Sequence, residues 1–180
     1  MGIKNGEYYG GYYMVKKIKI ILAIGFFPVV IFCYLIKLIY RSIEKRRSLQ
    51  FISNISIEEI DGLDGEEFEE LLAMFFRGRG LKVTKTKKSH DYGADLLVTT
   101  KDEVIAIQCK LYYKRPVSNS AIQEIATAKD YYSASRAVVI TNSKFTKPAE
   151  ILADKIGVKL IDRDSLQELL SSKREYNLNL

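Results

Sequence analysis

The clearest regular pattern in this chain of 180 residues is the alternation of side chains along residues 104–111. Alternate residues of a β-strand face opposite sides of a sheet, so this segment is predicted to be a strand. One face carries the side chains of Ile105, Ile107, Cys109 and Leu111. The other face carries those of Val104, Ala106, Gln108 and Lys110. The second face therefore ends in two polar groups that are aimed at one place.

A second apolar segment, residues 94–100, comes shortly before this strand and is separated from it by Lys101 and Asp102. Polar residues between two apolar runs favour a turn, so the two segments are predicted to pair as a hairpin. The hairpin would bring Asp95 beside Gln108 and Lys110.

Apolar residues at helical spacing predict a helix that Asp64 caps and Gly80 ends. Further elements are predicted along the chain: a strand at 81–87, a helix at 118–133 capped by Ser118 or Ser120, a strand at 136–141, a short helix from Thr146, a strand at 158–161, and a helix capped by Asp164 and ending near Lys173. The order α-β-β-β-α-β-α-β-α predicts an α/β fold with a mixed β-sheet core flanked by helices.

The N-terminal part of the chain has a different pattern. Residues 20–36 contain no charged side chain, and the apolar segment extended to residues 18–40 is long enough to cross a bilayer core of roughly 30 Å. We predict a transmembrane helix at 18–40, with a cleaved signal peptide as the alternative. The basic residues that follow favour a single-pass protein whose C-terminal domain is cytoplasmic. The predicted organisation is a disordered N-terminus at 1–17, the membrane helix, a linker at 41–60 and a domain at 61–176.

Charge is distributed unevenly along the chain. The formal net charge is +6, but residues 1–47 carry +7 and residues 48–180 carry −1. The basic balance therefore belongs to the N-terminal segment and gives no evidence for DNA binding by the domain. Cys33 and Cys109 are predicted to be packing residues, because their positions fit neither a disulfide framework nor a zinc site.

The three polar residues of the predicted hairpin suggest a chemistry. A carboxylate, an amide and an amine that converge on two strands could hold a divalent cation and an attacking water for phosphodiester cleavage. The alternative is that Asp95, Gln108 and Lys110 simply face solvent, as polar residues of a strand commonly do.

Five stretches of the chain together are similar to a known family. They are GEEFEELLAMFFRGRGLKV at 65–83, DYGADLLV at 91–98, VIAIQCKLYY at 104–113, TNSKFTKPA at 141–149 and LIDRDSL at 160–166. In this order they resemble the Mrr-type restriction endonuclease family of the PD-(D/E)xK nuclease superfamily. The resemblance implies a restriction-endonuclease-like fold, divalent-metal-dependent cleavage of DNA, and often the restriction of foreign or modified DNA.

The resemblance also implies roles for individual residues. Asp95 would be the main ligand of Mg²⁺ (or Mn²⁺), with Gln108 and the backbone carbonyl of Cys109 as further ligands. Lys110 would orient or deprotonate the attacking water. Gln108 stands where the superfamily more often has a glutamate, although Gln is frequent in the family that this chain resembles. Glu69 matches the glutamate of the family's first helix and would assist catalysis and metal binding, unless it is only a solvated acid.

Other polar residues near the proposed site are further candidates for metal or DNA binding. Asp91 competes with Asp95 as the metal ligand, but it lies in a predicted turn. A basic cluster near the proposed site predicts contacts with DNA by Lys87, Lys88, His90, Tyr112, Lys114 and Arg115.

The function predicted from the sequence is therefore a membrane-anchored, metal-dependent DNA endonuclease, with a homodimer expected because two strands must be cut. A non-cleaving, membrane-tethered module that binds or senses DNA is an alternative. A junction-resolving or RNA-directed nuclease on the same core is another.

Overall fold

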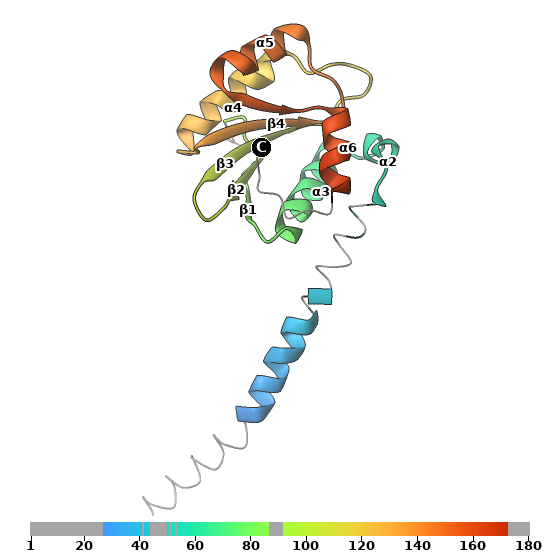
Figure 1. Cartoon of the computed structure of the whole chain (residues 1–180), viewed down its shortest axis with the longest axis vertical. Coiled ribbons are helices and arrows are strands. Elements are labelled where there is room, and N and C mark those ends of the chain that lie inside the picture. The colour runs from blue at the N-terminus through green and yellow to red at the C-terminus, as the bar shows by residue number, and fades with distance from the viewer. Residues whose placement is uncertain are drawn as a thin grey trace, which may run out of the picture. The chain divides into compact units, whose positions relative to one another are not determined.

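The computed structural model describes residues 27–40, 42–43, 50, 52, 54–86 and 92–172 (Figure 1). The chain divides into two compact units, Met1–Lys45 and Arg46–Leu180. Each unit is described by itself below. The predicted disordered segment at 1–17 and the first part of the predicted membrane helix, 18–26, lie outside the described residues.

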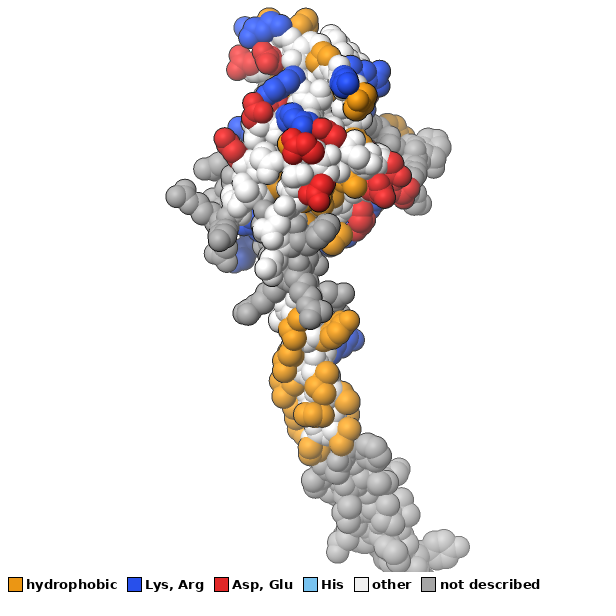
Figure 2. All heavy atoms as spheres, turned by 90° about the vertical axis from the view of Figure 1, so that its right-hand side faces the viewer, with side chains coloured by type: hydrophobic (Ala, Val, Ile, Leu, Met, Phe, Trp, Pro, Cys, Tyr) orange, Lys and Arg blue, Asp and Glu red, His pale blue; other side chains and the backbone are white. Residues whose placement is uncertain are grey.

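The first unit contains a helix over residues 27–40, whose side chains are mostly apolar and exposed (Figure 2). In the part of the chain that the structure describes, no helix is both long and apolar enough to cross a membrane. The described helix is shorter than the roughly 20 residues that a bilayer requires. The prediction of a single-pass membrane protein with a cytoplasmic C-terminal domain is therefore wrong. Cys33, predicted to be a packing residue, is exposed on this helix.

The second unit is built on a five-stranded sheet in the order β1-β2-β3-β4-β5. The strands are β1 (Lys82–Lys85), β2 (Leu96–Thr99), β3 (Val104–Lys110), β4 (Arg136–Thr141) and β5 (Val158–Ile161). The strands β1, β2 and β3 are antiparallel neighbours, whereas β3, β4 and β5 run parallel. The predicted mixed sheet is confirmed.

The β2–β3 hairpin closes as the sequence predicts, because Thr100 organises its turn. The backbone N–H of Thr100 donates to the carbonyl of Glu103 at 2.9 Å, and its hydroxyl accepts from the N–H groups of Asp102 and Glu103. A threonine that satisfies backbone donors in this way stabilises a tight turn between strands.

The helices are α2 (Ile57–Asp61), α3 (Gly65–Gly78), α4 (Asn119–Tyr131), α5 (Lys147–Ile156) and α6 (Arg163–Ser171). Asp64 caps α3 in a reciprocal pair of hydrogen bonds with Glu67, and Thr146 caps α5, as predicted. The cap of α6 is Asp162 instead of the predicted Asp164, because the Asp162 carboxylate accepts from the N–H of Ser165. Helix α2 lies within the predicted linker at 41–60 except for its last residue, Asp61.

Helices cover both faces of the sheet, with α3 and α6 on one side and α4 and α5 on the other (Figure 1). Ile52 and Ile55, which also lie in the predicted linker, are buried in the core on the α3 side. The carboxyl ends of the parallel strands β3, β4 and β5 meet at one edge of the sheet, and β2 begins at the same edge. This edge brings the candidate functional residues together.

Candidate active site

Asp95 lies against β3, as the hairpin register predicts. Leu96 is paired with Ile107, so the residue before it falls opposite Gln108. The backbone N–H of Asp95 donates to the carbonyl of Ile107 at 2.8 Å, and its Oδ2 accepts from the N–H of Cys109 at 2.6 Å. The carboxylate is therefore anchored to the strand that carries Gln108 and Lys110.

Gln108 and Lys110 converge on a carboxylate of helix α4. The Nε2 of Gln108 donates to Oε2 of Glu124 at 2.7 Å, and the Nζ of Lys110 lies 3.1 Å from the same oxygen. The two side chains therefore share the α4 face of the sheet, as their i, i+2 spacing predicts. One carboxylate holds both of them in place.

Gln108 also has an acceptor that the fold leaves unsatisfied. Its side chain is 2% exposed, and its Oε1 has no hydrogen-bond partner in the part of the chain that the structure describes. A buried polar atom without a partner costs about 1–3 kcal/mol, so it calls for an explanation such as a bound ion.

The turn before Asp95 is pressed against α4. Tyr92 and Gly93 have φ of 51° and 95°, both in the left-handed region. A Cβ on Gly93 would lie 2.8 Å from the Cβ of Glu124, so only glycine permits this approach. The ring of Tyr92 stacks on that of Tyr131, at the end of α4, with 3.9 Å between the ring centroids. These contacts fix the distance between the Asp95 turn and Glu124.

Glu69 approaches β3 from the α3 side of the sheet. Its carboxylate lies 3.4 Å from the Nζ of Lys85 on β1. Burial raises the pKa of the Cys109 thiol well above its ordinary value, and the charges of Asp95 and Glu69 raise it further, whereas Lys85 and Lys110 lower it. The charge of Glu69 therefore acts at the same point of β3 as that of Asp95.

The predicted metal ligands fit a hard cation by their chemistry. Among the described residues, no group of three or more His, Cys, Asp or Glu side chains could hold a metal ion. The predicted set does not need such a group, because it combines carboxylate oxygens with the amide oxygen of Gln108 and the backbone carbonyl of Cys109. All of these are oxygen donors, which Mg²⁺ and Mn²⁺ prefer. The unsatisfied Oε1 of Gln108 is the observation that supports the fit.

The predicted DNA-contacting residues fall into two groups. Lys87, Lys88 and His90 lie outside the described residues, as does Asp91. The other three lie together in the loop after β3, where the guanidinium of Arg115 is 4.0 Å from the ring centroid of Tyr112. The ammonium of Lys114 lies 4.8 Å from the ring centroid of Tyr113.

Sequence reasoning missed Glu124, although the chain carried a signal for it. Ala121 and Ala128 are buried residues of α4, and Glu124 is three residues after the first and four before the second. That spacing places an acid on the line of apolar residues that faces the sheet. An acid at such a position, on the helix that follows the Gln108 strand, was a candidate for the site.

The fold is α/β, with a five-stranded mixed sheet flanked by helices, as in restriction endonucleases. Residues 60–170 match the family model of the Mrr catalytic domain, described as a restriction endonuclease. The match covers more than half of the chain, so the chain belongs to this family. Membership indicates a restriction-endonuclease-type nuclease domain.

Two solved structures are similar to the chain. One is the crystal structure of a protein of unknown function, AF1548, with 16% identity and a TM-score of 0.48, covering 56% of this chain and 63% of that one. The other is the MspJI restriction endonuclease in complex with a 27-mer oligonucleotide, with 19% identity and a TM-score of 0.46, covering 74% of this chain and 32% of that one. This chain thus spans less than two thirds of the length of either. No curated protein matches it.

Proposed function

We propose that the protein is a divalent-metal-dependent DNA endonuclease that hydrolyses phosphodiester bonds, in the restriction of foreign or modified DNA. The observation that carries the proposal is the buried, unsatisfied Oε1 of Gln108, one residue along β3 from the N–H that binds the Asp95 carboxylate. The carboxylate of Glu124 lies within hydrogen-bonding distance of both the Gln108 amide and the Lys110 ammonium.

Asp95, Gln108 through Oε1, and the backbone carbonyl of Cys109 would hold Mg²⁺ or Mn²⁺, with Glu69 assisting from the α3 side. A cation bound there offsets the charge that gathers on the phosphoryl oxygens and lowers the pKa of a bound water. The ammonium of Lys110 donates hydrogen bonds to the attacking water or to the developing negative charge.

Glu124 is proposed as a positioning residue. By accepting from the Nε2 of Gln108, it orients the amide so that Oε1 remains available to a cation. By pairing with Lys110, it restrains the ammonium next to the same place. Partners that fix the orientation of metal ligands typically change metal affinity or activity by 10- to 100-fold when removed. The carboxylate also adds a negative charge beside an amide that has none.

Plasmid nicking by the full chain in Mg²⁺ or Mn²⁺ tests the proposal. The full chain is used because Ile52 and Ile55, upstream of the predicted domain at 61–176, are part of the core. Asp95→Asn keeps the side-chain shape and should abolish nicking, and Lys110→Ala should reduce it by about 10²-fold or more. Nicking that persists in both variants would exclude this site.

Glu124→Gln should reduce nicking by about 10- to 100-fold and raise the metal concentration that is needed. Its control is Glu150→Gln, on the exposed surface of α5, where the carboxylate pairs with Lys147 at 3.0 Å. Equal effects of the two substitutions would show that Glu124 has no special role. Because a single site cuts one strand, the proposal includes a homodimer for double-strand cleavage, which sedimentation in the presence of DNA would detect.

A second candidate function is DNA binding without cleavage. It is favoured by Gln108 itself, since an amide brings no charge to a metal site. Metal-independent DNA binding with no nicking in Mg²⁺ or Mn²⁺ would support it. Assays with branched DNA and with RNA would distinguish these two functions from those of a junction-resolving or RNA-directed nuclease.

A further inference from the structure

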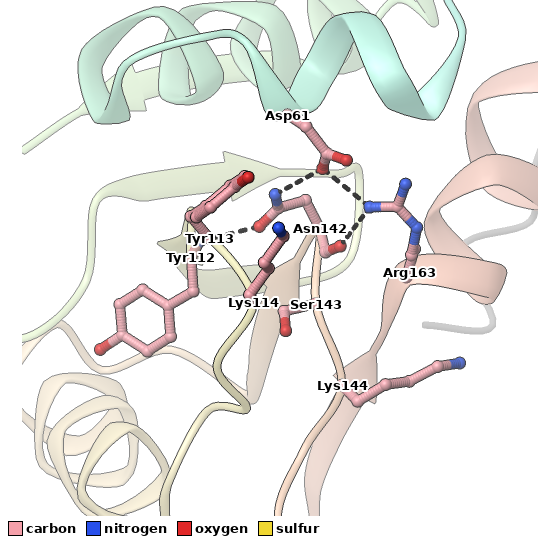
Figure 3. A pocket seen from close by; sticks show the side chains of 8 residues that line it. All are labelled: Asp61, Tyr112, Tyr113, Lys114, Asn142, Ser143, Lys144 and Arg163. Carbon is pink, nitrogen blue, oxygen red and sulfur yellow. Dashed lines mark hydrogen bonds and ion pairs between the residues drawn. The ribbon is translucent and has the colours of Figure 1, made fainter.

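A cavity of about 280 Å³ opens at the edge of the sheet where β3, β4 and β5 end (Figure 3). Its walls come from the end of α2, the loops after β3 and β4, and the start of α6. The residues that line it are Asp61, Tyr112, Tyr113, Lys114, Asn142, Ser143, Lys144 and Arg163. Ligands of α/β proteins commonly bind outside the carboxyl ends of parallel strands.

The polar side of the cavity is a preformed network centred on Asn142, which is 3% exposed. Its Oδ1 accepts from the N–H of Tyr112 at 2.8 Å, and its Nδ2 donates to Oδ1 of Asp61 at 2.8 Å. The Nη1 of Arg163 donates to the same Asp61 oxygen at 2.7 Å and to the carbonyl of Asn142 at 3.0 Å. The hydrogen bond from Arg163 lowers the pKa of Asp61, so the carboxylate stays ionised.

The opposite side is aromatic and basic (Figure 3). The side chain of Tyr113 is 73% exposed. The ammonium of Lys114 lies over its ring, 4.8 Å from the centroid. Lys114 has φ of 54°, a left-handed conformation that a residue other than glycine adopts at a cost. The rest of the fold therefore holds this loop in a strained arrangement that displays an aromatic ring and a cation.

The positive charge of the cavity is concentrated in this loop. Lys144 is paired with Asp162 and Asp164, and Arg163 is paired with Asp61. In the part of the chain that the structure describes, Lys114 and Arg115 take part in no ion pair, and their cationic groups lie over the rings of Tyr113 and Tyr112. An anion would therefore be drawn to the loop and not to the α6 side, where acidic and basic side chains are interspersed.

The cavity lies next to the candidate active site along the same strand. Tyr112 follows Lys110 by two residues, which is about 7 Å of extended chain. Lys110 is also opposite Thr141, whose hydroxyl donates to the Lys110 carbonyl at 2.6 Å, and Asn142 comes next. A ligand in the cavity would thus sit about one nucleotide away from the reacting phosphate.

We propose that the cavity binds one unpaired nucleotide of a DNA strand beside the bond that is cut. The exposed ring of Tyr113 stacks on the base, Lys114 and Arg115 bind the adjoining phosphate, and the Asp61–Asn142–Arg163 network meets the polar edge of the base. Aromatic rings combined with cations are the chemistry by which proteins hold single strands. The volume, about 280 Å³, lies just below the usual range for small-molecule sites, about 300–1,000 Å³. This inference rests on the proposed function and names its substrate as DNA that is unpaired next to the cleavage site.

Binding of the full chain to fluorescein-labelled oligothymidylate, followed by fluorescence anisotropy in EDTA, tests the aromatic contact without any cleavage. Tyr113→Ala should weaken binding by about tenfold, whereas Tyr113→Phe should retain it because stacking needs no hydroxyl. The control is Ile151→Ala on α5, where the side chain is 53% exposed. Unchanged binding in Tyr113→Ala, or an equal loss in the Ile151 variant, would overturn the proposal.

The salt dependence of the same binding tests the cation. Lys114→Asn removes the charge and tolerates the left-handed backbone. It should reduce the slope of log affinity against log salt by about 0.7, the value for one phosphate contact on a single strand. Lys147→Asn, at an exposed lysine of α5, should leave the slope unchanged. Equal slopes for the wild type and the Lys114 variant would contradict the assignment.

The two proposals can fail separately. Metal-dependent nicking without any binding of single strands would overturn the cavity proposal alone. Binding of single strands that depends on Tyr113, with no nicking in Mg²⁺ or Mn²⁺, would overturn the proposed endonuclease and leave the cavity as the site of a binding protein.

Discussion

The two faces of the sheet are packed with side chains of different size. The face under α3 and α6 is filled by large residues: Phe68, Leu72, Phe75, Phe76, Ile105, Ile107 and Leu166, among others. The face under α4 and α5 is rich in alanine, including Ala94, Ala106, Ala121, Ala128, Ala137, Ala149 and Ala153. The same sheet therefore supports a thick apolar layer on one side and a thin one on the other.

The thin layer explains why the candidate site lies on the α4 face. Small side chains let a helix approach a sheet closely, so the carboxylate of Glu124 reaches both Gln108 and Lys110. The turn at Gly93 then touches the backbone of α4 directly. The α3 face has the larger buried side chains, so we expect it to contribute more to stability, and we expect the α4 face to determine the geometry of the site.

The largest effect on stability is expected from the α3 face. Phe76→Ala removes a fully buried ring and should lower the free energy of unfolding by roughly 3–5 kcal/mol in urea titrations. The nicking activity per folded molecule should change little. Ile151→Ala, at an exposed position, should stay within about 0.5 kcal/mol of the wild type. A small loss for Phe76→Ala would contradict the assignment of stability to this face.

Overpacking the α4 face should separate activity from stability. Ala106→Val adds bulk between β3 and α4 and should cost about 1–3 kcal/mol. Because it also pushes α4 away from Gln108, nicking should fall by more than the folded fraction does. Val98→Ile adds a methyl group on the other face of the neighbouring strand and should reduce nicking only as far as it reduces folding. If nicking falls in proportion to folding in both variants, the proposal that the α4 face determines the geometry of the site is contradicted.

Gly93→Ala tests the same close approach from the loop. The new methyl group would lie 2.8–2.9 Å from atoms of Glu124, and the φ of 95° is strained for alanine. We expect a loss of about 1 kcal/mol or more and a lower nicking rate. Gly65→Ala, which meets no atom within 4 Å, should leave both quantities nearly unchanged. If the Gly93→Ala protein is as active and as stable as the wild type, the close approach of this turn to α4 is not required for activity or stability.

The smallest effect is expected from a polar contact at the sheet edge, and it depends on pH. The hydrogen bond from Arg163 lowers the pKa of Asp61 below its ordinary 3.8, so the ionised carboxylate stabilises the folded state. This contribution is present above pH 3.8 and is lost as the pH falls through the lowered pKa. The difference in stability between the wild type and Asp61→Asn should therefore shrink on acidification, as urea titrations at several pH values would show. A difference that does not depend on pH would exclude the charge as its cause.

Much of the fold could be predicted from local sequence patterns. The hairpin followed from alternation in β3 and the polar residues of its turn, and Asp64 and Thr146 cap their helices as predicted. Alternation also placed Gln108 and Lys110 on one face. These features depend on residues close together in the chain, whose spacing determines the side of the strand or helix to which each side chain points.

The sequence was less informative where distant segments meet. The contact of Glu124 with β3 depends on how closely α4 packs against the sheet. The alanines that allow this close packing come from several segments of the chain, so no local sequence pattern predicts it. Helix α2 has five residues, too few to show a helical period. At the start of α6, Asp162 and Asp164 are both suitable caps, and only the backbone conformation selects the first. The uncharged run at 20–36 predicted a membrane span, whereas no helix among the described residues is both long and apolar enough to cross a membrane.

The outer strands of the sheet restrict how two copies of the protein could join. Both β1 and β5 are four residues long, β1 carries Lys82 and Lys85, and β5 carries the exposed Lys159. Short edge strands that carry lysine disfavour hydrogen bonding to a strand of another molecule. A pair of these domains placed for a double-strand cut would therefore have to associate through helices or loops and not by continuing the sheet from one molecule into the next.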